Sequence, residues 1–584
     1  MVANESSIQS AGPRFDRAGF WIAAALGTLV SLAITGFVFA IGNNLFHLPI
    51  VAELWDEPQF TNDEFIQALR YYAAGPWMLL RGSASYVNPY WSFLLLFVIS
   101  RLLSIVGFLA CARLLGIVSR SQQICFALLV SVTWLLRGDA VGGGGGLFIN
   151  YFAHSEMANG LVLLALYLAF RLRIAAAIAM VGVIFFVNAF MGVWTAVVVG
   201  VVFVAQIARG DLKGARILLP CATGAAIACL FAIPVVTSIL SNPDFGKPLA
   251  FDYIAFLKEY YPFHFLFGLI SLRAKIGLAF IIAIGVGAFA NFGKLGHLWL
   301  VALLAACAIY VVGIFAPYVT HSPTILNLHL LRTSVLIQLL SALAVCALAT
   351  SWWFGEERFR ARLAAPIVFV LLSVPIDSYL RSPIILALGL FLAASAFTPV
   401  LKTLSHRVPD GLVRQGRRLR IAAAVWLVCT IPVLMFEHRQ VDQLVQAWTD
   451  EWQMIGVWAR ENTPVDAIFM NPVVKANIPP YTEEEVGGAS DAIFNYTAHR
   501  RVWVGFKKGA AVMWSPSYYY VWHRRVSEVS SLVTHQEKLD YAQKNGLSYV
   551  VEICLDANRE KPLFSTKRIC VYDVTRPADT SQKS

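Results

Sequence analysis

Charged side chains are scarce in this chain. Asp, Glu, Lys and Arg make up 14% of its 584 residues, whereas 58% of the residues are hydrophobic. An average soluble protein carries about 25% charged residues, which cover its surface. The shortage of charge therefore excludes a soluble globular protein and indicates an integral membrane protein.

Several catalytic signatures are also missing. The sequence contains no H-E-x-x-H, paired C-x-x-C or Gly-x-Ser-x-Gly motif, so zinc-peptidase and serine-hydrolase functions have no support. The run Gly142–Gly146 is not followed by Gly-Lys-Ser/Thr, which rejects a nucleotide-binding loop in favour of a flexible hairpin. The net charge of +11 lies in short connectors between apolar runs, so nucleic-acid binding is not expected.

Long apolar runs dominate what is present. A spanning helix needs about 20 mostly apolar residues, and this pattern predicts about thirteen spans. The first run is too long for a signal peptide and is interpreted as an uncleaved helix. The predicted spans are 20–41, 91–117, 122–137, 157–171, 174–190, 191–208, 215–240, 265–291, 297–317, 331–352, 364–380, 383–400 and 420–436.

The distribution of Lys and Arg predicts a cytoplasmic N-terminus, because the basic connectors alternate with acidic or neutral ones. An odd number of spans then places the chain after about Glu437 outside the membrane. Residues 437–584 alternate helical and strand patterns and are predicted to form a small extracytoplasmic α/β domain. The sequence thus predicts a mainly α transmembrane domain, 1–436, with an outer loop at 42–90, followed by this α/β domain.

Cysteine usage leaves one question open. Seven of the nine cysteines lie in apolar runs, where a small buried side chain is expected. Cys554 and Cys570 lie in the predicted outer domain, where an oxidising compartment allows a disulfide. Spacing alone does not decide between a disulfide and two thiols.

The predicted first outer loop gathers acid. "LPIVAELWDEPQFTNDEFIQALRYY" contains Glu53, Asp56, Glu57, Asp63 and Glu64, and apolar and aromatic residues interleave with them. This interleaving predicts short amphipathic helices at the membrane surface, which would hold a carboxylate at a fixed depth. A partly buried carboxylate with a raised pKa suits general-base chemistry, although most acidic loops serve solubility alone.

Other polar groups are predicted on the same side of the membrane. Asp139, Asn150, His154 and Glu156 surround the glycine run, while His264 and Arg332 lie at the outer ends of later helices. A lone cation at the membrane boundary usually extends to the lipid headgroups, and the alternative is neutralisation of a lipid-linked phosphate. Carboxylate oxygens suit Mg²⁺ or Mn²⁺, but the spacing requires no metal ion, so no cofactor is assigned.

The layout of many helices, an acidic first outer loop and an outer α/β domain resembles the GT-C superfamily of membrane glycosyltransferases. The segments "GNNLFHLPIVAELWDEPQFTNDEF", "WARENTPVDAIFMNP" and "RRVWVGFKKGAAVMWSPSYYYVWHRR" are similar to a group of bacterial membrane proteins with that architecture. The resemblance implies an enzyme of the bacterial inner membrane and cell envelope. Its donor would be a polyprenyl-phosphate sugar, and its acceptor a glycan, lipid or protein.

The resemblance also implies site residues. In the superfamily an acidic residue of the first outer loop serves as base or binds a metal, which favours Asp63, then Glu64, with Asp56 and Glu57 as rivals. Superfamily loops often present the acidic pair close to the first helix, whereas Asp63 lies well downstream. Further candidates for substrate binding are His154, His264, Arg332, Lys507 and Trp514, of which Arg332, His264 and Lys507 would stabilise the leaving phosphate and Trp514 would stack on a sugar ring.

Two other classes of function remain open. A transporter or flippase of a lipid-linked or polar substrate normally carries ionisable residues inside its spans, and here Arg101 is the main example. No inverted repeat is evident in the sequence. A non-catalytic membrane scaffold would keep the same architecture and use its outer domain to bind partners.

Overall fold

The computed structural model describes residues 15–137, 140–143, 147–212, 217–357, 360–375, 410–474, 486–488, 490–554 and 561–574. These residues form two compact units. We call the first the helical unit, which comprises the chain up to Gly36, Leu96–Pro234 and Phe251–His438. The second, the sheet unit, comprises Phe37–Leu95, Val235–Ala250 and the chain from Arg439 onward.

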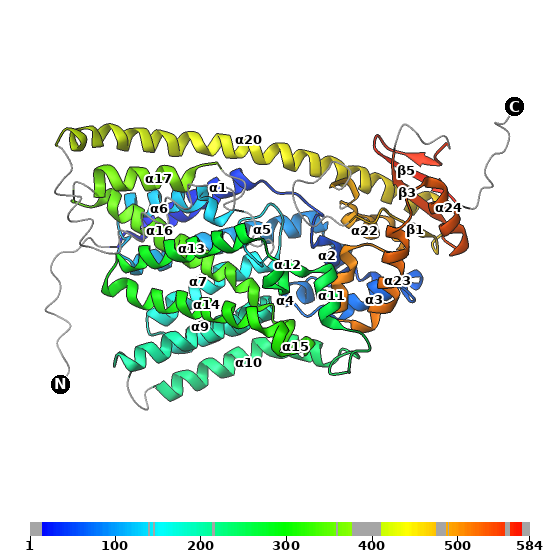
Figure 1. Ribbon diagram of the computed structural model, residues 1–584, viewed down its shortest axis with the longest axis horizontal. Helices are drawn as coiled ribbons and strands as arrows, with labels where there is room; N and C mark the ends of the chain where they lie inside the picture. The colour runs from blue at the N-terminus through cyan, green and yellow to red at the C-terminus, as the bar shows by residue number, and fades with distance from the viewer. Residues whose placement is uncertain are drawn as a thin grey trace. The chain divides into compact units, whose positions relative to one another are not determined.

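Long helices build the helical unit (Figure 1). The end of α10 and the beginning of α5 extend into the sheet unit, as does the C-terminal part of the 53-residue α20. In chain order the helices are α1 (Arg17–Thr35), α5 (Pro89–Leu114), α6 (Arg120–Val132), α7 (His154–Phe170), α8 (Ile174–Val187), α9 (Ala189–Ala208), α10 (Leu218–Leu240), α11 (Tyr253–Tyr260), α12 (Pro262–Phe265), α13 (Leu272–Ala290), α14 (Lys294–Val319), α15 (Pro323–Leu326), α16 (Ser334–Phe354), α17 (Ala365–Ser373) and α20 (Asp410–Asn462).

Eight helices of the described residues are long and apolar enough to cross a membrane, and α7 and α8 are shorter apolar helices. The chain is therefore a multi-pass membrane protein. The predicted first span, 20–41, is observed at Arg17–Thr35, because Asp16 caps its beginning and Gly36, at φ 67°, follows its end. The predicted spans 122–137 and 364–380 coincide with the shorter helices α6 and α17, and 383–400 lies outside the described residues.

Small residues allow the helices to pack closely. Gly27 of α1 faces Ala127 of α6, where an added Cβ would lie 3.1 Å from the Ala127 Cβ. Close approach through small residues drives helix association in membranes, where the lipid tails remove the usual hydrophobic force. The apolar part of helix α16 is completely buried, and the helix packs against α13, α14 and α6. It therefore forms the centre of the helical unit.

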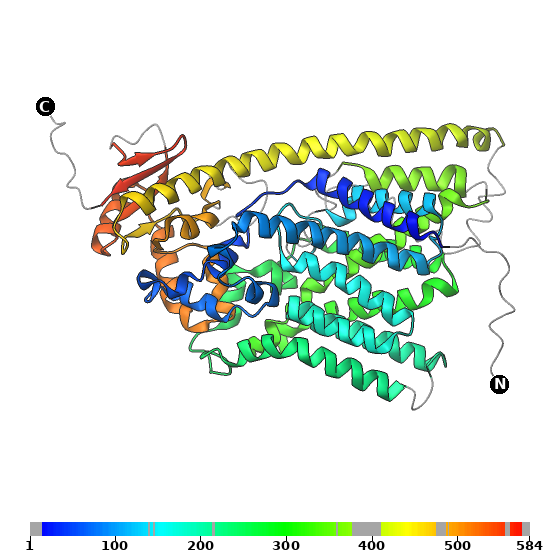
Figure 2. The ribbon, with the colours of Figure 1, turned by 180° about the vertical axis from the view of Figure 1, so that it is seen from behind.

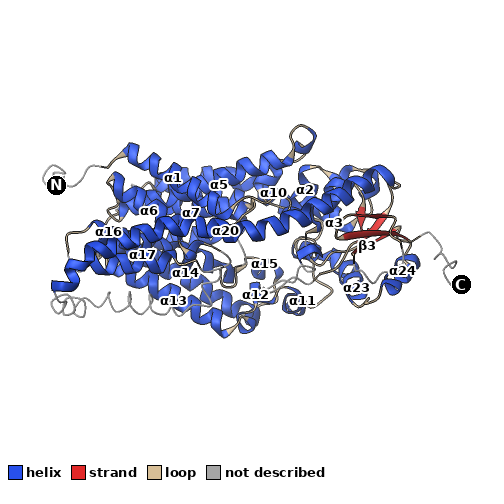
Figure 3. Cartoon of the chain, turned by 90° about the horizontal axis from the view of Figure 1, so that it is seen from above, coloured by secondary structure: helices blue, strands red, loops and turns tan. Residues whose placement is uncertain are grey.

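The sheet unit contains five strands in the order β2-β1-β3-β5-β4 (Figure 3). β1 pairs in parallel with β2 and β3, whereas β5 is antiparallel to β3 and β4. The strands are β1 (Ile468–Met470), β2 (Arg501–Val502), β3 (Tyr549–Ile553), β4 (Phe564–Ser565) and β5 (Ile569–Asp573); the helices are α2 (Asn44–Val51), α3 (Glu64–Ala68), α4 (Gly75–Leu79), α22 (Phe494–Ala498), α23 (Tyr519–Ser530) and α24 (His535–Lys544).

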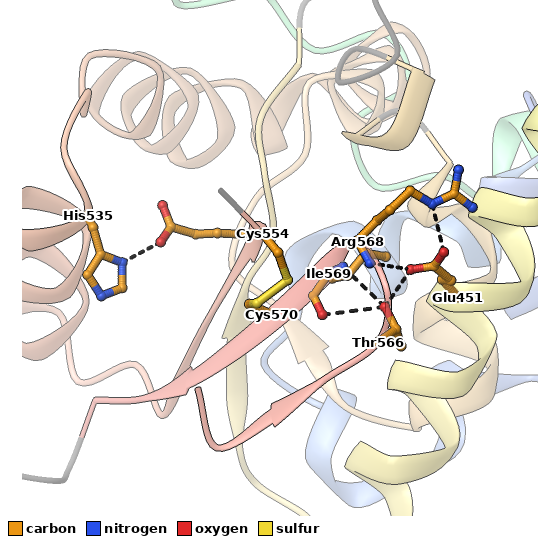
Figure 4. The surroundings of a disulfide bond; sticks show 8 residues. Glu451, His535, Cys554, Thr566, Arg568, Ile569 and Cys570 are labelled. Atoms are coloured by element: carbon orange, nitrogen blue, oxygen red, sulfur yellow. Dashed lines mark hydrogen bonds and ion pairs between the residues drawn. A yellow bond between two sulfur atoms is a disulfide. The ribbon is translucent and has the colours of Figure 1, made fainter. Parts of the chain in front are cut away.

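A disulfide joins Cys554, directly after β3, to Cys570 of β5 (Figure 4). The sequence had left this pairing open. Close by, Glu451 of α20 accepts hydrogen bonds from the Arg568 backbone amide and side-chain Nε, at 2.9 and 2.7 Å. These two links fix the β4–β5 hairpin to β3 and to the end of α20.

Candidate functional site

The acidic first loop packs against the C-terminal domain within the sheet unit. In Figure 2 the blue segment that carries α2 and α3 lies beside the orange segment that carries α22 and α23, and their residues are in contact. Leu54, Phe60, Phe65 and Ile66 are buried in the protein. Phe65 packs against Tyr518 of the C-terminal domain, with 6.3 Å between the ring centres. The predicted placement of the loop at the membrane surface stays a prediction.

Three carboxylates of the loop face basic side chains of the C-terminal domain. Glu57 Oε1 lies 2.7 Å from His499 Nδ1, and Glu64 Oε2 lies 3.3 Å from a guanidinium nitrogen of Arg525. Asp63 Oδ2 is 4.0 Å from Arg501 Nε. The acid of the first loop thus complements basic residues that lie more than 400 positions further along the chain.

Asp63 occupies the N-cap position of α3. Its Oδ1 accepts a hydrogen bond from the Ile66 backbone amide at 3.0 Å, and the residue is 5% exposed. An N-cap carboxylate satisfies an amide that the first helical turn leaves without a partner. Burial raises the pKa of Asp63, while the charges of Lys508 and Arg501 act in the opposite direction.

Lys508 is a buried cation next to this carboxylate. Its Nζ donates to Asn495 Oδ1 at 2.9 Å and lies 4.9 Å from the centre of the Phe65 ring. Burial lowers the pKa of Lys508, whereas the charges of Asp63 and Asp491 raise it. A buried charge is tolerated where opposite charges and hydrogen bonds compensate for lost water, and here two carboxylates and an amide do so.

The other acidic candidates differ in their surroundings. Asp56 forms an exposed ion pair with Arg70 at 2.8 Å, an interaction of little energetic value at the surface. Glu64 shares Arg525 with the Trp503 ring, whose centre lies 3.8 Å from the guanidinium carbon. Glu57 is 30% exposed and is the carboxylate of the loop that pairs with a histidine.

Trp514 connects three segments of the sheet unit. Its indole nitrogen donates to the Ala68 carbonyl at 3.0 Å, and its own carbonyl accepts from Asn242 at 2.5 Å. Its ring makes edge contacts with Phe46 and Tyr72. This residue packs the first loop against the C-terminal domain, while its stacking on a sugar stays a prediction. Lys507 is exposed at the start of the 3-10 turn Lys507–Met513.

A second group of candidates lies in the helical unit. Arg332 Nε donates to the Gly143 carbonyl at 2.6 Å, which fixes the described part of the glycine loop. Arg332 interacts electrostatically with His154, the first residue of α7, and with His329. His264 also interacts electrostatically with His329. The structure therefore brings together Arg332, His154 and His264.

His329 was missed by the sequence analysis. It belongs to the stretch "NLHLLRTS", three residues before Arg332, and adopts a left-handed backbone with φ 50°. Its ring packs against Phe190 and Phe265. A histidine and an arginine three positions apart at the start of a long apolar helix were the available signal.

A buried ion pair lies among the helices of the same unit. Arg101 Nε donates to Glu156 Oε1 at 2.7 Å, and the side chains are 0% and 1% exposed. Arg101 also donates to Thr35 Oγ1 and to the Ile149 carbonyl, at 3.2 and 2.8 Å. Asp139 and Gly144–Gly146, which the sequence placed near Glu156, lie outside the described residues.

In the described parts of the chain, the loop carboxylates do not have the arrangement of a metal site. There, no three His, Cys, Asp or Glu side chains gather closely enough to hold an ion. Glu57, Asp63 and Glu64 each face a basic side chain of the C-terminal domain instead.

Comparisons with known proteins give similarity at the level of structure. No protein-family model and no curated protein matches the chain. Among solved structures, the chain is similar to the arabinofuranosyltransferase AftD from Mycobacteria, with 14% sequence identity and a TM-score of 0.41. The similarity covers 92% of this chain and 35% of that one, so the present chain spans about a third of its length.

Proposed function

We propose that this protein is a membrane glycosyltransferase that transfers a sugar from a polyprenyl-phosphate donor to an extracytoplasmic glycan, lipid or protein. The observation that carries the proposal is the gathering of Arg332, His154, His264 and His329 in the helical unit. A guanidinium with several imidazoles around it suits a phosphate group, to which it offers charge and hydrogen-bond donors. The donor brings its own leaving group, so the outer side needs no soluble nucleotide.

The location proposed for the protein is the bacterial inner membrane, with a cytoplasmic N-terminus and an extracytoplasmic C-terminal domain. The pattern of basic connectors supports this orientation. The Cys554–Cys570 disulfide supports it independently, because disulfides persist in oxidising compartments outside the cytoplasm. The sheet unit, with its acidic first loop, would then face the acceptor side.

In the proposed reaction an acceptor hydroxyl attacks the anomeric carbon, and the bond from this carbon to the phosphate oxygen breaks. Arg332 would stabilise the negative charge on the departing lipid phosphate, with His154 and His264 beside it. A general base would take the proton of the hydroxyl. Asp63 is the first choice from the sequence for this role.

The test is transfer of radiolabelled sugar from a panel of polyprenyl-phosphate donors in membranes that contain the wild type or a variant. Arg332→Leu is expected to abolish transfer, whereas Arg120→Gln, which removes an exposed ion pair with Asp16, is the matched arginine control. Asp63→Asn keeps an N-capping side chain and tests the base. Absence of transfer by the wild type from every donor would contradict the proposed function.

One observation favours a second class. The buried Arg101–Glu156 pair is the kind of intramembrane charge that marks substrate or proton pathways in transporters. Uptake or flipping of a lipid-linked sugar in vesicles, with no transfer to an acceptor, would support a flippase. Neither transfer nor flipping, together with unchanged phenotypes of all loop variants, would support the scaffold.

A further inference from the structure

Glu57 and His499 form a carboxylate–imidazole pair that the sequence did not suggest. His499 Nδ1 lies 2.7 Å from Glu57 Oε1. Gln59 Nε2 donates to the other carboxylate oxygen at 2.5 Å and to the His499 carbonyl at 3.2 Å. One side chain of the first loop therefore orients the carboxylate and also holds the histidine backbone.

The pairing decides which ring nitrogen is basic. An ionised carboxylate only accepts hydrogen bonds, so Nδ1 of His499 must carry the shared proton. In the neutral ring the lone pair is then on Nε2. Across the described residues, no group forms a hydrogen bond with Nε2 of His499. This arrangement is the one by which a carboxylate orients a histidine that acts as a base.

The backbone of His499 is held in an uncommon conformation. Its φ of 48° lies in the left-handed region, which is unfavourable for a residue other than glycine. The carbonyl of His499 accepts hydrogen bonds from Gln59 and from Arg500 Nη1, the latter at 3.1 Å. Two donors therefore fix a strained residue, as is common where a side chain must point in a set direction.

The side chains of Glu57 and His499 are more exposed to solvent than that of Asp63. The side chains of His499 and Glu57 are 20% and 30% exposed, whereas that of Asp63 is 7% exposed. Asp63 Oδ1 is already occupied by the amide of Ile66. A bulky acceptor can approach His499 without unfolding the cap of α3, and a base must come within hydrogen-bond reach of its proton.

We propose that His499, oriented by Glu57, is the general base that takes the proton from the acceptor hydroxyl. The proposal rests on the proposed glycosyltransferase function and assigns the proton acceptor to a residue of the C-terminal domain. Glu57 acts as a positioning residue through its bond to Nδ1. The acceptor group is then a hydroxyl presented to the sheet unit.

In the proposed step, one proton and one sugar are transferred. The acceptor oxygen forms a bond to the anomeric carbon while its proton passes to Nε2 of His499. The bond between the anomeric carbon and the phosphate oxygen breaks, and the electron pair leaves with polyprenyl phosphate. The imidazolium, stabilised by Glu57, then releases its proton to water, and no oxidant, reductant or metal is required.

The first experiment compares transfer by the wild type, His499→Asn and His535→Asn. Asparagine tolerates the left-handed backbone and can still donate to Glu57. His535 is a matched control, because its Nδ1 also bonds a carboxylate of the sheet unit, Glu552. His499→Asn is expected to lower kcat by about 10²–10⁴-fold with an unchanged KM, the usual contribution of a general base. An unchanged kcat would overturn the proposal.

The second experiment tests Glu57 by the values of kcat and KM. In Glu57→Gln the imidazolium that forms in the step loses its counter-ion, so kcat should fall while KM stays unchanged. A structural role alone would change KM together with kcat. Arg460, Glu57 and Asp466 all interact electrostatically with the nearby Arg500, and Asp540→Asn, in exposed α24, is the carboxylate control.

The third experiment does not depend on transfer activity. Diethyl pyrocarbonate modifies neutral imidazole nitrogens, and mass spectrometry of the peptides gives the rate at each histidine. Glu57→Gln should change the rate at His499 several-fold and leave the rate at His535 unchanged. If the wild type transfers no sugar yet the rate at His499 depends on Glu57, the proposed function fails alone. An unchanged rate at His499 in Glu57→Gln would overturn the dyad, and so would normal transfer by His499→Asn with loss in Asp63→Asn.

Discussion

Glu57 and His499 lie 442 positions apart in the chain, yet 2.7 Å separates Oε1 of one from Nδ1 of the other. The same segments are joined again by Glu64 and Arg525, and by Asp63 with Arg501. Acid is therefore concentrated in the first loop because a basic partner surface exists within the same compact unit. Charge complementarity of this kind favours one register between two surfaces.

Substitution of Asp63 by alanine should destabilise the sheet unit by about 1 kcal/mol, the usual cost of losing an N-cap side chain. Asp63→Asn should cost much less, because asparagine caps a helix equally well and burial does not penalise a neutral amide carrying the same hydrogen bond. Thermal unfolding of the purified protein in detergent measures both. Asp56→Ala, which removes an exposed pair, is the control, and equal losses in all three variants would contradict the capping role.

The free energy of unfolding should depend on pH because burial raises the pKa of two carboxyl groups. Burial raises the pKa of Asp63 and of Asp491 above the model-compound value of 3.8. Just above that value the native state binds more protons than the unfolded state, so the free energy of unfolding falls as pH rises through this window.

The double variant Asp63→Asn/Asp491→Asn does not titrate at these positions. Its free energy of unfolding relative to the wild type should therefore increase between about pH 4 and about pH 7. Thermal unfolding over this range checks the sign. A difference between the two proteins that is constant with pH would show that the two carboxyl groups titrate normally.

Loss of one partner of the buried Arg101–Glu156 pair should be severe. Arg101→Met leaves Glu156 without its cation in a site that is 1% exposed, which typically costs about 3–5 kcal/mol. The double variant Arg101→Met/Glu156→Met should recover most of this loss, because apolar side chains can replace a buried pair. Melting temperatures of the three proteins test this, with Arg120→Met as the exposed control. A double variant no better than the single one would refute the coupling.

The disulfide leads to two predictions, one about stability and one about the side of the membrane on which the C-terminal domain lies. The two cysteines are 16 positions apart, and closing a loop of that length stabilises a domain by about 3 kcal/mol. Cys554→Ser/Cys570→Ser should lower the melting temperature of the sheet unit accordingly.

A variant that keeps only Cys554 and Cys570 reports the side of the membrane. An impermeant maleimide applied to intact cells should label it only after reduction. Labelling without reductant would indicate free thiols, and no labelling under either condition would place the domain inside.

The sequence predicted the parts of the fold that depend on local composition. The spans 191–208 and 331–352 correspond closely to α9 and α16, because a continuous apolar run is itself the requirement for a membrane helix. The strands of "LSYVVEI" and "RICVYDV" were likewise visible as short β-branched runs. The first span was placed too far along the chain, since hydropathy does not register the turn that Gly36 produces.

The candidate site depended on information that no local pattern contains. Asp63 was predicted as an acid of the first outer loop, but its burial beside Lys508 depends on a partner more than 400 positions away. His499 had no signal, because a single histidine before two arginines is unremarkable in sequence. Arg332, His154 and His264 were each predicted singly, and only the packing of the helices brings them together with His329.

The sheet unit is built from three separate stretches of the chain, and this sets an order of events during synthesis. Gln59 bonds the His499 carbonyl, 440 positions later. At about 5–20 residues per second, the ribosome needs about 20–90 s to make the intervening chain. Throughout that interval the first loop has been translated, while the surface that buries its apolar side chains does not yet exist. The unit therefore completes its fold only after the last span has been made, and a truncated chain would leave this loop unpartnered.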